Sequence, residues 1–150
     1  MAAIAPTLRP RTALRRWRGP LLVGALMAIY PLFVAVAVYP RYLAADLPGG
    51  RNGPADAYRH SLASAVVAYT LSSRCVDWVT RLMEHDGIGS PSRAMDAHNN
   101  RIGARIGASA DSWTSMQQAV LAAVNTGAVD ARSPDQITWL APDAWQKRLY

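Results

Sequence analysis

An uncharged run near the N-terminus constrains this chain most. Residues 19–40, GPLLVGALMAIYPLFVAVAVYP, include 22 positions without a charged side chain. A helix needs about 20 apolar residues to cross the hydrocarbon core of a bilayer. Arg18 and Arg41 bound the run, and Tyr39 and Tyr42 lie where an interfacial aromatic belt would be. We therefore expect a single transmembrane helix at 19–40.

The arginines around this run predict its orientation. Only Arg41 and Arg51 follow it closely, whereas five arginines precede it: Arg9, Arg11, Arg15, Arg16 and Arg18. The positive-inside rule then makes residues 1–18 a basic cytoplasmic tail and places the rest of the chain outside. The sequence thus predicts a single-pass protein of the inner (cytoplasmic) membrane, with a C-terminal domain that is periplasmic or extracellular.

Two other interpretations of the run stay open. Ala35-Val36-Ala37 resembles a cleavage site, so the N-terminus could be a cleaved signal peptide. That alternative also exports the domain. The third interpretation, a buried helix of a soluble protein, fits 22 uncharged residues less well. We favour the anchor because the apolar run continues past the cleavage-like site.

The remaining composition excludes some classes of function. Without the five N-terminal arginines, 11 basic side chains remain against 10 acidic ones, so the domain itself is almost neutral. A nucleic-acid partner is therefore not expected, since such a domain needs clustered Lys and Arg. Cys75 is the single cysteine, which rules out an intrachain disulfide and zinc sites built from several cysteines.

The pattern after the run predicts a small all-α domain at 54–150, preceded by a linker at 41–53. Pro54 suits the first position of a helix that reaches about Leu71. Three further helices are predicted at 73–85, from Ser90 to about Ala108, and at 112–126 with Asp111 as its cap, with a short tail helix from Pro142. Residues 137–140 resemble a short strand, for which we expect no partner. The expected fold is a transmembrane helix followed by four or five helices.

Candidate catalytic residues open the first helix of this domain. Asp56 and His60 are four residues apart and share one helical face, with Arg59 at its edge. A carboxylate beside an imidazole can orient the ring and raise its basicity, as a general base requires. The alternative is an ion pair on a solvated surface.

A second polar cluster is expected on the helix that follows Ser90. Asn and Gly are poor helix formers, so their alignment on one stripe needs a reason. That stripe holds Asp96, Asn99, Asn100, Gly103 and Gly107. The glycines would let another backbone approach closely and bring the polar side chains against it. Both a structural hydrogen-bond network and a catalytic or metal-assisted site fit this pattern.

The polar blocks together resemble a bacterial domain family of unknown function. Its pattern is N-G-x-x-D-A-x-R-H, then H-E, then M-D-x-x-N-N-x-x-G, and here residues 52–107 carry NGPADAYRH, HD and MDAHNNRIG. The family recurs in secreted and polymorphic-toxin-like proteins and implies an α-helical, hydrolase-type domain. Asp86 stands where the family has Glu, which puts the middle block in doubt.

The resemblance and the chemistry together predict a hydrolase on the envelope side of the membrane. Its substrate would be a phosphate or pyrophosphate ester of a lipid or lipid-linked cell-wall precursor. His60, Asp56, Arg59 and Asp96 would be catalytic, and Asn99, Asn100 and Arg101 would bind substrate. His85 and Asp86 are the expected ligands if a divalent metal takes part. The alternatives are a non-enzymatic envelope scaffold or partner-binding protein, and a toxin or effector domain.

Overall fold

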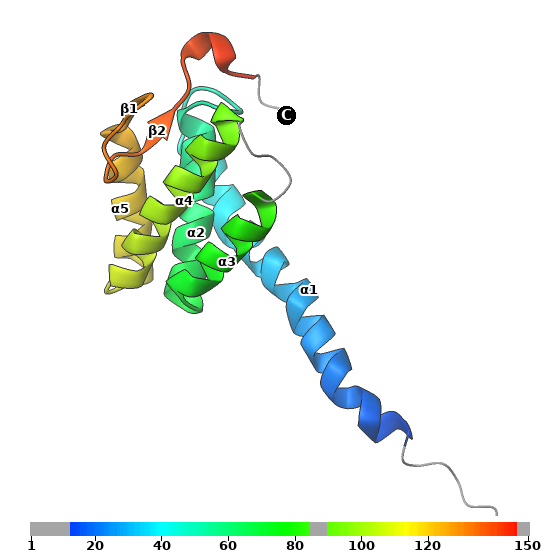
Figure 1. Cartoon of the computed structure of the whole chain (residues 1–150). Coiled ribbons are helices and arrows are strands. Elements are labelled where there is room, and N and C mark those ends of the chain that lie inside the picture. The colour runs from blue at the N-terminus through cyan, green and yellow to red at the C-terminus, as the bar shows by residue number, and fades with distance from the viewer. Residues whose placement is uncertain (1–12, 85–89, 147–150) are drawn as a thin grey trace, which may run out of the picture. The chain divides into compact units, whose positions relative to one another are not determined.

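The computed structural model describes residues 13–84 and 90–146. Within them, the chain forms five helices, two short strands and a 3-10 turn (Figure 1). The predicted all-α class is confirmed. The elements, in order, are α1 Ala13–Ala44, α2 Pro54–Thr70, α3 Ser73–Glu84, α4 Pro91–Ser109, α5 Trp113–Asn125, β1 Ala128–Val129, β2 Thr138–Trp139 and the turn Pro142–Ala144.

Helix α1 carries the apolar run. Its segment Gly19–Ala44 is, by length and composition, the one helix among the described residues that could cross a membrane. Leu21 and Leu22 are 66% and 65% exposed, so the chain itself does not cover this surface. The described structure divides after Phe33 into two units, and the second begins at Val34 within the same helix.

The last turns of α1 belong to the second unit. Val38 and Tyr42 are 2% exposed and lie in the domain core, where Val34 also packs. These three residues recur at four-residue steps and therefore form one helical stripe. The helix continues to Ala44, past the predicted end at residue 40. Part of the predicted linker is thus helical, and Leu47 in the rest of it packs against the core.

Helices α2 and α4 form the tightest pair in the domain, and glycines make this possible. A Cβ atom at Gly103 would lie 2.1 Å from the carbonyl oxygen of Ser61. One at Gly107 would lie 2.1 Å from that of Ala65. No side chain fits in such a gap, which confirms that the two glycines let another backbone approach. This contact fixes the polar side chains of α2 opposite those of α4.

Helix α5 covers the other side of α2, through a core stripe of Met116, Val120 and Val124. Its cap is Ser112, one residue after the predicted Asp111. The Ser112 hydroxyl accepts a hydrogen bond from the Ser115 amide, and the Ser115 hydroxyl accepts one from the Ser112 amide. This reciprocal pair satisfies two amides at the start of the helix.

The residues after α5 correct two predictions. The segment around 137–140 does form a strand, but β2 has a partner: β1 pairs with it in parallel, Ala128 opposite Thr138. A two-residue strand such as β1 carries too little pattern to be recognised. The expected tail helix at Pro142 is a single 3-10 turn.

Candidate functional site

The first turn of α2 holds Asp56 in place. Its carboxylate accepts a hydrogen bond from the Asn52 amide at 2.8 Å and forms an ion pair with the Arg59 guanidinium. Asn52 has a positive φ of 64°, which turns its amide toward the start of the helix. Asp56 is 2% exposed, and a carboxylate at a helix N-terminus also interacts favourably with the helix dipole. Asp56 is therefore a buried, fully partnered charge.

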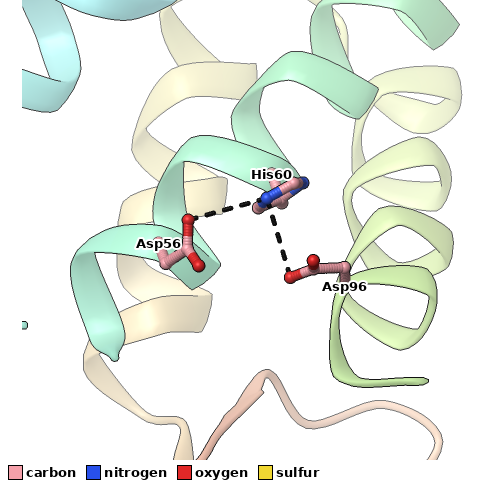
Figure 2. A group of neighbouring side chains, drawn as sticks. All are labelled: Asp56, His60 and Asp96. Carbon is pink, nitrogen blue, oxygen red and sulfur yellow. Dashed lines mark ion pairs between the residues drawn. The ribbon is translucent and has the colours of Figure 1, made fainter. Parts of the chain in front are cut away.

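The imidazole of His60 lies between two carboxylates. Its Nε2 atom is 3.6 Å from Oδ1 of Asp56 and 3.6 Å from Oδ1 of Asp96, as Figure 2 shows. The same atom is 3.3 Å from Nη2 of Arg59. A protonated Nε2 can interact with the carboxylates, and an unprotonated one can accept from the guanidinium. Nε2 therefore has a partner in both protonation states, which suits an atom that takes up and releases a proton.

Asp96 on α4 is the least satisfied member of the group. Its Oδ1 atom is buried and has no hydrogen-bond partner among the described residues. Burial raises the pKa of the Asp96 carboxyl above its ordinary value, and nearby Asp56 raises it further. His60, Arg59 and Arg51 act in the opposite direction but do not cancel the effect of burial. Asp96 thus keeps its proton to a higher pH than a solvated aspartate would.

His60 and Asp96 line a pocket of about 370 Å³ between α2, α3 and α4. Its polar lining residues include Arg51, Arg93 and Asn100, together with hydroxyl side chains. Its apolar lining residues are Val67, Val76 and Val79 with two alanines. The full lining is Arg51, His60, Ala63, Ser64, Val67, Val76, Val79, Thr80, Ser92, Arg93, Asp96, Ala97 and Asn100. Such a pocket suits a ligand with an anionic group at one end and an apolar group at the other.

The predicted substrate-binding residues separate in the structure. Asn100 lines the pocket, accepts a hydrogen bond from Ser64 at 2.9 Å and reaches Thr80 at 3.5 Å. Asn99 instead bonds both backbone groups of Thr138, at 2.7 and 3.0 Å, and is fully buried. Arg101 is exposed and does not line the pocket. Asn99 and Arg101 thus lie outside the pocket lining, because neighbouring helical positions point about 100° apart, and their expected role in substrate binding stays a prediction.

Of the predicted catalytic residues, Asp56, Arg59, His60 and Asp96 do come together. Arg59 pairs with Asp56 and is not part of the pocket lining, so it positions the carboxylate. Two other arginines, Arg51 and Arg93, line the pocket. No sequence pattern singled out Arg51, whose backbone is held by a bridge to Gln146 from the far end of the chain.

A metal could be held by a different set of residues from the predicted one. His85 and Asp86 lie outside the described residues. Asp56, His60 and Asp96 each offer one ligand atom, all within 4.8 Å of one another. One imidazole and two carboxylates form a donor set for a divalent ion. Arg59, however, already occupies Asp56 and approaches His60 Nε2, so an ion would have to displace its guanidinium.

The fold and the site define a small all-α domain whose pocket is lined by the His60 imidazole and the Asp96 carboxyl. The apolar helix α1 continues into this domain. Residues 35–130 match the family model described as "Domain of unknown function (DUF6973)". The match covers more than half of the chain, which therefore belongs to this family. It begins one residue after the start of the second unit, so the last turns of α1 are part of the family domain. Searches of curated proteins and of solved structures returned no match.

Proposed function

We propose that the pocket is the active site of a hydrolase that acts on a phosphate or pyrophosphate ester of a lipid or lipid-linked precursor. One observation carries the proposal: His60 and a carboxyl with a raised pKa, Asp96, face each other in a pocket that is also lined by two arginines and three valines. Sites that run acid–base chemistry pair groups in this way.

The proposed reaction uses the two groups in turn. His60 Nε2 takes a proton from a water molecule, whose oxygen forms a bond to phosphorus. The bond from phosphorus to the leaving oxygen breaks, and the protonated Asp96 gives its proton to that oxygen. The proton on His60 then returns to Asp96 across the 3.6 Å between their atoms, which restores both groups. Metal-free acid–base catalysis of this kind needs no movement of Arg59.

The arginines of the pocket would hold the anionic group. Arg51 and Arg93 line the same pocket as His60 and Asp96. A guanidinium binds phosphate oxygens through paired N–H donors and stabilises the charge that develops during hydrolysis. Asn100, fixed by Ser64, offers an amide beside them. The valines would receive the apolar part of the substrate, which is why a lipid ester fits better than a water-soluble one.

The membrane location is part of the same proposal. Helix α1 would anchor the chain, and the arginines at 9–18 would keep its N-terminus in the cytoplasm and the domain on the envelope side. The apolar run overlaps the domain, because Val38 lies in the domain core. A membrane-anchored domain meets lipid headgroups at a high effective concentration.

A second candidate function is a non-enzymatic envelope protein. The observation that favours it is the satisfied state of Asp56 and Asn99, both buried and both used to hold chain segments together. In that case the polar residues define the fold, and removing one partner would cost about 1–3 kcal/mol of stability.

The test is product detection by mass spectrometry. The full chain in detergent is incubated with bacterial envelope lipid extract, with and without divalent metals, beside a His60→Gln variant of equal helical content. We expect a hydrolysed lipid product whose rate of release falls at least about 100-fold in the variant, because the general base is lost. Equal product release, or no product from either protein, would overturn the proposal and favour the scaffold.

A further inference from the structure

Helix α3 carries a tryptophan that the domain leaves largely exposed. Trp78 is 67% exposed, more than any other large apolar side chain that the structure describes. Three other tryptophans, Trp113, Trp139 and Trp145, are partly buried and have contacts. Trp113 packs edge-on against Tyr69, Trp139 lies against Gly127, and Trp145 donates to the Leu140 carbonyl at 2.7 Å. The exposure of Trp78 on α3 therefore needs an explanation that the other three tryptophans do not need.

The two faces of α3 differ sharply. Val76 is buried and, like Thr80 one turn later, lines the pocket. The opposite face presents Arg74, Trp78 and Arg81, at steps of four and three residues, all exposed. Asp77, which is also exposed, lies at the edge of that face. Just before the helix, Leu71 is 57% exposed. The outward face thus combines apolar side chains with a small positive charge.

We propose that the outward face of α3, formed by Arg74, Trp78 and Arg81, docks on an anionic lipid surface. The amphipathic tryptophan ring prefers the level of the headgroups, and each arginine gains from anionic lipid. Helices that lie in the membrane interface have this composition. The chain also carries its own apolar helix of membrane-spanning length, so a lipid surface is the partner nearest at hand. This docking does not depend on the proposed reaction.

A consequence for the pocket does depend on the proposed function. Val79 lines the pocket and is also 44% exposed, so it lies between the pocket and the outward face. Docking of α3 would then present the apolar lining residues of the pocket to the lipid. A lipid ester could enter from the side without its acyl chains crossing water.

The test measures the environment of Trp78 in the full chain, reconstituted into nanodiscs of phosphatidylcholine with or without phosphatidylglycerol. The emission of Trp78 is obtained by subtracting the spectrum of a Trp78→Phe variant, which stays apolar. In discs with phosphatidylglycerol, brominated acyl chains should quench this emission by about half or more, since the ring lies at the interface. The measurement contains no enzymatic step, so its result does not depend on whether the proposed hydrolase activity exists.

Charge variants sharpen the test. Arg74→Gln and Arg81→Gln should each reduce the quenching, as should high salt, whereas Asp77→Asn should increase it. Arg105→Gln is the matched control, because Arg105 is an exposed arginine on α4 paired with Asp135, and it should change nothing. Equal emission with brominated and ordinary lipids would overturn the proposal. So would oxidative coupling of two chains through Cys75 on α3, because it would show that a second copy covers this face.

Discussion

At the scale of single residues, the site depends on one unsatisfied carboxyl next to an imidazole. Asp56 is fully partnered, while Asp96 is left with a buried oxygen that no described residue bonds. Polar groups are rarely left in this state unless they serve a purpose, and active sites are where such cost is tolerated. From this contrast between the two aspartates, we propose that Asp56 positions His60 and that Asp96 transfers the proton.

The Asp96→Asn variant tests the state of this carboxyl. Because burial raises the pKa of Asp96 in the folded protein, folding stability is highest below the unfolded value of about 3.8 and falls as pH rises through the folded value. An asparagine cannot ionise and avoids this loss. We expect the variant to melt a few degrees higher than the unsubstituted chain near pH 8.

Thermal unfolding followed by circular dichroism at several pH values checks this expectation. The difference in melting temperature should shrink toward pH 3, where Asp96 is protonated in both states. A variant that melts lower at pH 8 would show that the ionised carboxylate stabilises the fold, contrary to the role given to it here.

At the scale of elements, the sequence indicated that another backbone would approach α4 closely, but it did not indicate which one. The polar stripe with Gly103 and Gly107 indicated a close backbone approach, since glycine disfavours a helix unless space requires it. Helical spacing also brought Asp56 and His60 to one face. It could not tell that Asn99 and Asn100 would serve different partners, or that Arg51 would reach the pocket, because both depend on segments 36 or more residues away.

The Gly103→Ala variant tests the α2–α4 contact on which the site depends. The added Cβ would lie 2.1 Å from the Ser61 carbonyl oxygen, so the helices must separate. We expect a loss of about 1–3 kcal/mol or more in the free energy of unfolding by urea. Gly24→Ala is the matched control within a helix, since nothing lies within 4 Å of its added Cβ. Equal midpoints for the two variants would contradict the packing described.

At the scale of the whole molecule, the boundary between the apolar helix and the domain differs from the one that composition suggests. A run of uncharged residues predicts a membrane span. It does not predict the residue at which the same helix starts to pack against a protein core. Val38 and Tyr42 therefore look like part of the span in the sequence and lie in the core in the structure. The start of the family match at residue 35 agrees with the structural boundary.

Two fragments test this boundary. A fragment that begins at Val34 keeps Val38 and Tyr42, whereas one that begins at Ala45 lacks both. Each fully buried side chain of this size contributes about 1.5–3 kcal/mol, a large part of the stability of a small domain. We expect the shorter fragment to melt at a clearly lower temperature, or without cooperativity, by circular dichroism. Equal melting of both fragments would place the boundary at the end of α1 instead.

The proposed function requires that His60 acts chemically in the pocket. The product assay tests this requirement, with a variant of a second histidine as the control. His98 lies on α4 outside the pocket lining and bonds the Gln136 carbonyl at 2.8 Å. The full chain, His60→Gln and His98→Gln are compared on the same lipid extract at equal folded concentration. We expect product from the full chain and from His98→Gln, and at least about 100-fold less from His60→Gln. Equal rates for all three would contradict it.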